Sequence, residues 1–172
     1  ADMSGLDVIH NVATNLYPAI PDDERREVFQ LPESFQEMVE EGKYGNKAGE
    51  GFYKKVRTDS GKEYRVIDPE SHEYESQIDP DFESATEAKK KFSTSEQRLK
   101  FLVSQDDNVG QFLWDIHCDL LLYVANRIPE ITDSLESIDR AMKWGFNWEL
   151  GPFERWDAIG VREAVGRMQD EG

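Results

Sequence analysis

The stretch Gly45-Asn-Lys-Ala-Gly-Glu-Gly-Phe-Tyr53 is the most distinctive part of the sequence. Three glycines within seven residues indicate a tight backbone, with positive φ angles or a close approach to another surface. A phosphate-binding loop is one interpretation. However, the lysine precedes the second glycine and no Ser or Thr follows it, so the usual pattern of such loops is absent. We therefore predict a structural turn that leads into a β-hairpin.

The residues on either side of this turn have clear local patterns. Two strand-like segments, 52–56 and 64–67, flank four turn-forming residues at 58–61, and a third short strand could pass through His72 and Tyr74. Upstream, apolar residues recur at helical spacing over 5–20 and 33–41. We expect Ser4 to cap the first of these helices and Gly42 to end the second.

The second half of the chain is predicted to be helical throughout. Residues 84–102 form one helix or a broken pair, 108–127 a long apolar helix and 134–144 a further one, with Ser134 as cap and Gly145 as stop. Pro152 fits the first turn of a last helix that runs toward residue 160. The stretch 144–157 holds three Trp and two Phe. It is either an aromatic binding platform or, as we favour, a filled junction between helices.

The composition limits which partners and sites we expect for this chain. The formal charge of −16 opposes binding to nucleic acid, and the exceptions are local lysines such as Lys43 and Lys47. The single Cys118 has no disulfide partner and should pack as a small hydrophobe. Three scattered histidines lack metal-ligand spacing, so neither a metal site nor a catalytic residue is predicted. No apolar run reaches the roughly 18 residues of a membrane span. We expect a soluble, cytoplasmic protein with no membrane partner.

The two ends of the chain share one short internal sequence similarity. Asp2-Met-Ser-Gly-Leu6 is matched 155 positions later by Asp157-Ala-Ile-Gly-Val161, and an amphipathic helical pattern follows each. The match suggests that the chain opens inside one repeat and ends inside another. Asp157 itself is expected to cap the helix that follows rather than to act as a base.

Together these motifs resemble those of 3-hydroxyacyl-CoA dehydrogenases. The end of their helical C-terminal domain is similar to the turn at 45–53 together with the preceding segments 5–7 and 38–43. The start of the same domain, in a second copy, is similar to residues 138–145 and 151–161. The residues that carry the structural motif are Gly45, Gly49, Gly51, Phe52, Tyr53, Gly151, Pro152, Phe153 and Asp157.

The resemblance implies a mainly α fold, like the C-terminal helical bundle of 6-phosphogluconate dehydrogenase. It implies two partial tandem repeats and a small hairpin near 52–67. We expect residues 1–57 to be the second half of a first repeat, 58–83 a hairpin and linker, and 84–172 the first half of a second, degenerate repeat.

The resemblance is closest to fused dehydrogenase and enoyl-CoA hydratase enzymes of fatty-acid β-oxidation. In that family a His base and a Glu in a Rossmann domain oxidise the 3-hydroxyacyl-CoA with NAD. No Gly-x-Gly-x-x-Gly follows a strand here, so we expect an inactive piece without a cofactor, whose partner is an upstream Rossmann domain of the same polypeptide. The piece would cover the substrate and form a repeat or dimer interface, and by itself it would self-associate.

The resemblance also bears on individual residues. Lys43 and Lys47 are the candidates for contact with the acyl-CoA. The family's substrate-contacting Asn-Arg pair is not Asn126-Arg127, because the family's spacing places the equivalent position near Trp114. The alternative function is a non-catalytic, acidic, all-α interaction module that retains the fold.

Overall fold

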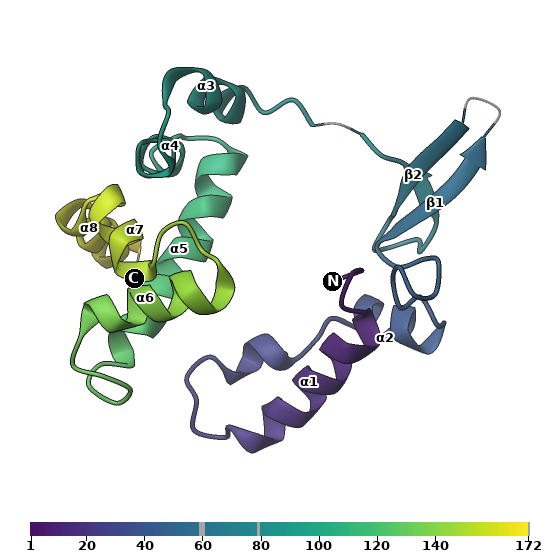
Figure 1. The fold of residues 1–172 in the computed structure, drawn as a ribbon, viewed down its shortest axis with the longest axis horizontal. Coiled ribbons are helices and arrows are strands. Elements are labelled where there is room, and N and C mark those ends of the chain that lie inside the picture. The colour runs from purple at the N-terminus through teal and green to yellow at the C-terminus, as the bar shows by residue number, and fades with distance from the viewer. Residues whose placement is uncertain (59–60, 79, 172) are drawn as a thin grey trace. The chain divides into compact units, whose positions relative to one another are not determined.

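The computed structural model describes residues 1–58, 61–78 and 80–171 and divides the chain into two compact units. Unit 1 is Ala1–Asp79 and unit 2 is Pro80–Gly172. Unit 1 combines two α-helices with a small sheet, and the described part of unit 2 is built from helices alone (Figure 1). The mainly α fold with a small antiparallel sheet is therefore confirmed.

The helices of unit 1 follow the apolar periodicity, with one error at a helix end. They are α1 (Leu6–Ala19), a 3-10 turn η1 (Arg26–Phe29) and α2 (Glu33–Glu40). The prediction of Ser4 as the cap of α1 was wrong, because Gly5 takes this position with φ 103° and no side chain caps the helix. The positive φ favours glycine at this position, and a Cβ there would also lie 2.6 Å from a side-chain oxygen of Asp7, which would have to move.

The predicted hairpin is present and carries a third strand. Strands β1 (Tyr53–Thr58), β2 (Gly61–Ile67) and β3 (Tyr74–Ser76) form an antiparallel sheet in the order β1-β2-β3. Tyr53 pairs with Val66, and Ile67 pairs with Tyr74. Residues 59 and 60 of the predicted turn lie outside the described residues. The core of unit 1 consists of Leu6, Phe35, Met38 and Ile67, which joins both helices to the sheet.

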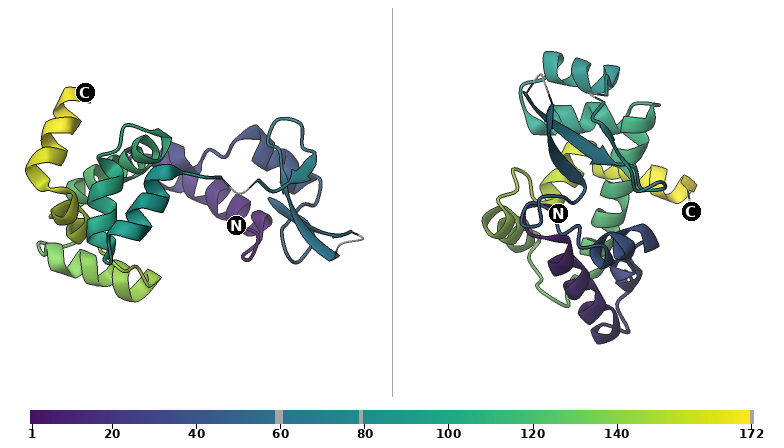
Figure 2. Two further views of the ribbon diagram at one scale, coloured as in Figure 1. Left: turned by 90° about the horizontal axis from the view of Figure 1, so that it is seen from above. Right: turned by 90° about the vertical axis from the view of Figure 1, so that its right-hand side faces the viewer.

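Unit 2 contains six described helices, which Figure 2 shows from two further sides. They are α3 (Glu83–Lys91), α4 (Ser95–Val103), α5 (Asn108–Asn126), α6 (Leu135–Phe146), α7 (Pro152–Ile159) and α8 (Val161–Glu171). The first segment is thus a broken pair, and Thr94 caps its second helix by accepting a hydrogen bond from the Gln97 amide at 3.4 Å. Pro152 opens α7, as predicted, where the missing N–H of proline costs no helical hydrogen bond.

The ends of α6 show one correct prediction and one wrong one. Ser134 caps the helix as expected, since its Oγ accepts from the Ser137 amide at 3.3 Å. Gly145 does not stop it, because α6 continues to Phe146 and ends at Asn147, which has φ 55°. Asn is among the few non-glycine residues that adopt the left-handed conformation readily, so it performs the role expected of glycine.

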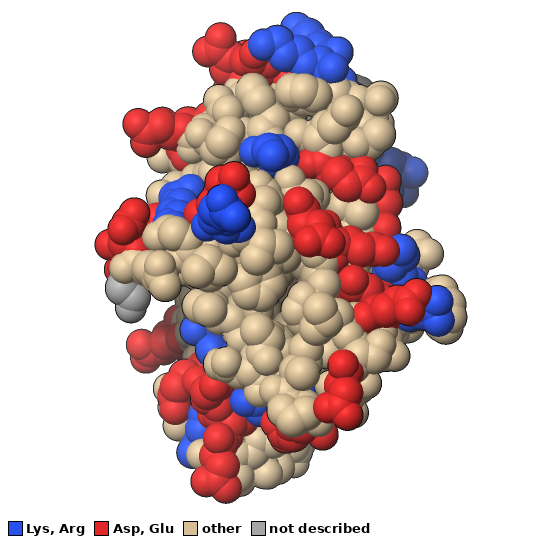
Figure 3. All heavy atoms as spheres, turned by 90° about the vertical axis from the view of Figure 1, so that its left-hand side faces the viewer, with Lys and Arg blue, Asp and Glu red and all other residues tan. Residues whose placement is uncertain are grey.

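Unit 2 packs around one apolar cluster. The buried members are Val103, Trp114, Leu121, Ile159 and Ala164, which come from α4, α5, α7 and α8. Cys118 packs against this cluster as predicted, and burial raises the pKa of its thiol. Acidic side chains with interspersed basic ones surround uncharged surface on the face shown in Figure 3. Among the described helices, none is long and apolar enough to cross a bilayer.

Candidate functional site

The glycine-rich turn of unit 1 is organised around the carboxylate of Asp2. Its Oδ1 accepts from the Phe52 amide at 3.0 Å and its Oδ2 from the Tyr53 amide at 2.8 Å. A Cβ at Gly45 would lie 2.5 Å from the Asp2 carbonyl oxygen, and one at Gly51 would lie 2.5 Å from the Gly45 Cα. The glycines therefore allow backbone to pack on backbone, and the amides of the turn bind a side chain of the protein itself.

A tyrosine that the sequence did not single out completes this turn. The Tyr74 hydroxyl, on β3, donates to the Gly51 carbonyl at 2.7 Å. Burial, with the negative charges of Glu50 and Asp2 nearby, raises the pKa of Tyr74 to about 12. The hydroxyl therefore stays protonated and remains a donor at physiological pH. The pairing of β2 with β3 brings Tyr74 to the turn, and this contact spans 23 residues of sequence.

Both lysines proposed for substrate contact already have partners within unit 1. Lys43 Nζ lies 2.6 Å from Glu41 Oε2, and Lys47 Nζ lies 2.6 Å from Asp7 Oδ2. The hydrogen bond from Lys47 lowers the pKa of Asp7, and that from Lys43 lowers the pKa of Glu41. A coenzyme A phosphate would have to compete with these carboxylates, and the contact stays a prediction.

Unit 2 contains a buried carboxylate, that of Asp139, between α6 and α7. Asp139 is only 6% exposed, and it accepts from the Phe153 amide at 2.8 Å and the Glu154 amide at 3.2 Å. These amides belong to the first turn of α7, whose unpaired N–H groups and dipole favour an anion. Burial raises the pKa of Asp139 even though both amide bonds act in the opposite direction. A Cβ at Gly151 would lie 2.3 Å from Asp139 Oδ1, so this glycine makes room for the carboxylate.

A second carboxylate, that of Glu154, stabilises the start of the same helix. Glu154 accepts from the Gly151 amide at 2.9 Å and from Lys143 Nζ at 2.7 Å. The lysine and the amide together lower the pKa of Glu154. Helix α6 supplies Lys143 and Asp139, and α7 supplies the groups that they bind, so polar contacts join the two helices at two points. Asp139 lies within the motif at 138–145, but no local pattern there predicts this role.

Only some of the aromatic side chains of residues 144–157 are packed against other residues of unit 2. Phe153 and Trp156 stack with ring centroids 6.3 Å apart, and the guanidinium of Arg155 lies 4.2 Å from the centre of the Trp148 ring. Trp144 is 78% exposed and Phe146 is 70% exposed, so these two side chains do not fill a junction within unit 2. The prediction of a filled junction is therefore wrong for these two side chains.

The remaining candidate residues have structural partners. Trp114, where the family's spacing places the substrate-contacting position, is 2% exposed and donates to Glu171 at 2.6 Å. Arg127 pairs with Glu130 at 3.0 Å. His117 lies 2.7 Å from the Leu113 carbonyl, and burial lowers its pKa. Within the described ranges, His, Cys, Asp and Glu form no group of three that could hold a metal.

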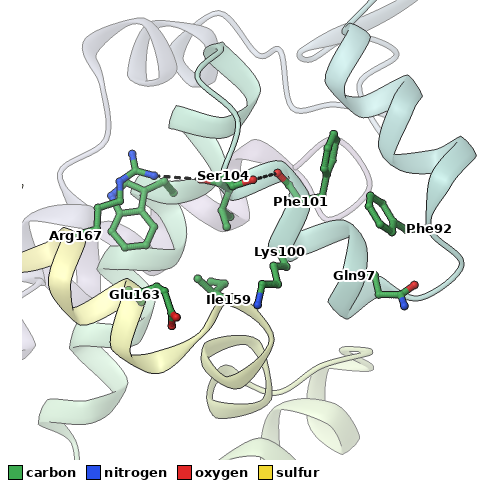
Figure 4. A pocket seen from close by; sticks show the side chains of 11 residues that line it. Phe92, Gln97, Lys100, Phe101, Ser104, Ile159, Glu163 and Arg167 are labelled. Atoms are coloured by element: carbon green, nitrogen blue, oxygen red, sulfur yellow. Dashed lines mark hydrogen bonds between the residues drawn. The ribbon is translucent and has the colours of Figure 1, made fainter.

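Unit 2 also contains an apolar hollow of about 460 Å³ between α4 and α8 (Figure 4). Phe92, Phe101 and Ile159 line it, and Lys100 and Glu163 stand at its side. Arg167 is held there by a 3.1 Å bond to the Val103 carbonyl. The hollow can take an apolar group. The described residues that line it include no nucleophile paired with a base, so it carries no catalytic geometry.

The glycine-rich turn does not have the surroundings of a dinucleotide-binding turn. A dinucleotide needs a glycine-rich turn between a parallel strand and the N-terminus of a helix. Here the glycine-rich turn precedes β1 of an antiparallel sheet, and its amides bind Asp2. This turn therefore cannot hold the pyrophosphate of NAD in the way that a dinucleotide-binding fold does.

Comparison with known proteins points to one family. The profile of the family described as "3-hydroxyacyl-CoA dehydrogenase, C-terminal domain" matches residues 1–55. A probable 3-hydroxyacyl-CoA dehydrogenase of Bacillus subtilis is 42% identical over 99% of this chain and 21% of its own length. A putative fatty acid oxidation complex trifunctional enzyme of Rickettsia prowazekii is 27% identical over 89% of this chain and 20% of its own length.

A third relative, a probable 3-hydroxyacyl-CoA dehydrogenase of Deinococcus radiodurans, is 48% identical over 36% of this chain and 17% of its own length. No solved structure matches the chain significantly. The chain spans about a fifth of the length of the Bacillus and Rickettsia relatives. Residues 1–55 thus match the C-terminal domain of 3-hydroxyacyl-CoA dehydrogenases, and nearly the whole chain is related in sequence to a probable enzyme of that family.

Proposed function

We propose that the chain forms a helical part of an NAD-dependent 3-hydroxyacyl-CoA dehydrogenase of fatty-acid β-oxidation. The observation that carries this proposal is the 42% identity with the Bacillus relative, which extends over 99% of the chain. The names of the Rickettsia relatives support fatty acid oxidation as the process. The enzyme would oxidise a 3-hydroxyacyl-CoA to the 3-ketoacyl-CoA in the cytoplasm. Its dinucleotide-binding residues would lie in a Rossmann domain of the same polypeptide.

In this proposal the chain covers and supports the reacting part of the enzyme. A cover of this kind excludes water from a thioester and holds the substrate in place. It needs a rigid scaffold, which the contacts of Asp139 and Glu154 at the start of α7 supply in unit 2. It also needs a surface that binds another domain or copy.

Exposed apolar side chains of unit 2 support the interface role. Phe112 is 62% exposed on α5, and Trp144 and Phe146 on α6 are exposed still further. Monomeric soluble proteins seldom expose large contiguous apolar patches, and we propose that these side chains belong to a patch that another surface covers. We accordingly expect the chain to self-associate when it is studied alone.

A chimera tests the proposal. In the Bacillus relative, the aligned region is replaced by this chain, and the chimera is assayed with NAD and a 3-hydroxyacyl-CoA by the absorbance of NADH. The chain alone serves as the negative control, and the unaltered relative as the positive one. The proposal predicts dehydrogenase activity in the chimera and none in the chain alone. A chimera that is folded, binds NAD and still lacks activity would favour the alternative, an interaction module that has lost the enzymatic role.

A further inference from the structure

The apolar hollow of unit 2 has the size of a small-molecule site. Its volume of about 460 Å³ lies within the range of about 300–1,000 Å³ that such sites usually have. On one wall the rings of Phe92 and Phe101 have centroids 5.2 Å apart. Trp114 and Ile159 on the other walls are 2% and 7% exposed. Both belong to the buried cluster of unit 2, so the core of the unit holds these walls in place.

The hollow is also elongated. Its lining runs along α4 from Gln97 to the C-cap residue Ser104, which corresponds to about 10 Å along a helix axis. Phe92 extends the lining beyond the start of this helix (Figure 4). An elongated apolar space fits an extended alkyl chain better than a compact polar group.

Positive charge is concentrated beside this hollow. Residues 87–100 carry five basic side chains and two acidic ones, whereas the whole chain has a formal charge of −16. Lys91 is paired with Glu87, and its Nζ lies 6.0 Å from the centre of the Phe101 ring. Lys100 lines the hollow itself, and no described carboxylate lies within ion-pair distance of it. An anion is therefore favoured at this place despite the charge of the whole chain.

Two other charged side chains at the hollow are already engaged. Arg167 donates to Glu171 Oε1 at 2.7 Å, so its charge is balanced. The Glu163 carboxylate lies against the start of its own helix, since a Cβ at Gly160 would lie 2.4 Å from Glu163 Oε2. The N-terminus of a helix favours a carboxylate in this place. Lys100 is thus a cation beside the hollow whose charge no described carboxylate balances.

We propose that this hollow binds a free fatty carboxylate, with the alkyl chain between Phe92, Phe101 and Ile159 and the carboxylate beside Lys100. The two parts of such a ligand match the two parts of the site. A neutral apolar molecule would gain nothing from the lysine, and an alkyl cation would be repelled by it. The inference rests on the lining of the hollow and does not depend on the proposed dehydrogenase function, because the ligand is a free acid and not a thioester.

The test compares decanoate with decylammonium, which share an alkyl chain and carry opposite charges. Binding to the whole chain is measured by isothermal titration calorimetry below the concentrations at which micelles form. Non-specific adsorption to a chain of charge −16 favours the ammonium. The site predicts instead that decanoate binds about fivefold more tightly, as expected for an exposed ion pair.

A matched pair of variants tests the role of Lys100. Lys100→Glu should reverse the preference, so that decylammonium becomes the tighter ligand. Lys89→Glu makes the same charge change at an exposed residue of α3 that does not line the hollow, and decanoate should remain the tighter ligand.

Chain length and position test the hollow itself. Affinity should rise about fourfold for each added methylene until the hollow is filled, and then stay level. Adsorption to an open surface would continue to rise with length. In NMR spectra, decanoate should shift the methyl signals of Ile159 and leave those of Ile67, in the core of unit 1, unchanged.

Several outcomes would overturn the proposal. They are a preference for decylammonium, equal effects of Lys100→Glu and Lys89→Glu, and Ile159 signals that do not respond to decanoate. Tighter binding of decanoyl-CoA than of decanoate would overturn the choice of a free acid, because the thioester group carries no charge to place beside Lys100.

Discussion

Replacement of Asp139 by alanine should destabilise unit 2 strongly. The substitution leaves the amides of Phe153 and Glu154 without their acceptor at the start of α7. A hydrogen bond to a charged group contributes about 1.5–3 kcal/mol, and the raised pKa of Asp139 shows that burial of the charge offsets part of this gain. We expect a net loss of about 2–4 kcal/mol in the free energy of unfolding for Asp139→Ala. Asp139→Asn, which retains one acceptor oxygen, should lose about half as much.

Urea unfolding followed by tryptophan fluorescence measures this change in unit 2 alone. All four tryptophans of the chain lie there: Trp114, Trp144, Trp148 and Trp156. Asp133→Ala removes an exposed carboxylate from the same unit and should change stability by less than about 0.5 kcal/mol. An unfolding free energy for Asp139→Ala that equals that of this control would refute the role given to Asp139.

Three further predictions concern pH, glycine and assembly. Lys143 lowers the pKa of Glu154 below its usual 4.5. The ionised Glu154 therefore stabilises unit 2 above pH 4.5, and this stabilisation is lost as the pH falls through the lowered pKa. Glu154→Gln should accordingly make the urea midpoint fall less steeply between about pH 5 and 3. Gly51→Ala should speed amide hydrogen exchange in the turn, because the added Cβ would lie 2.5 Å from the Gly45 Cα. Gly145→Ala should instead raise the free energy of unfolding by about 0.5–1 kcal/mol, because Gly145 lies inside a helix and a Cβ there meets no other atom within 4 Å. Light scattering should show self-association at micromolar concentration, and replacing Trp144 and Phe146 by serine should reduce it; a monomeric parent chain would contradict this.

Local patterns in the sequence were sufficient for most of the secondary structure. Apolar residues at helical spacing predicted α1, α2 and α5 to within one or two residues, Pro152 predicted the start of α7, and strand-like segments around a turn predicted the hairpin. These features depend on neighbours in sequence, which is why periodicity reports them. The errors were at helix ends, where Gly5 and Asn147 replaced the expected Ser4 and Gly145.

The candidate sites depended on contacts that no local pattern contains. The pairing of Lys47 with Asp7 crosses 40 residues, and that of Asp2 with Tyr53 crosses 51. The role of Asp139 appeared only once α6 and α7 were placed side by side. The similarity of 2–6 to 157–161 was visible in the sequence, but only the structure showed that Asp2 binds the amides of Phe52 and Tyr53.

The rate of NADH formation by the chimera is the most direct test of the central claim. If this chain is the helical part of a 3-hydroxyacyl-CoA dehydrogenase, the chimera should have a kcat/KM within roughly tenfold of the Bacillus relative, a difference of about 1.4 kcal/mol in transition-state stabilisation. The chain alone should form no NADH under the same conditions. A folded, NAD-binding chimera without measurable turnover, or turnover by the chain alone, would contradict the account.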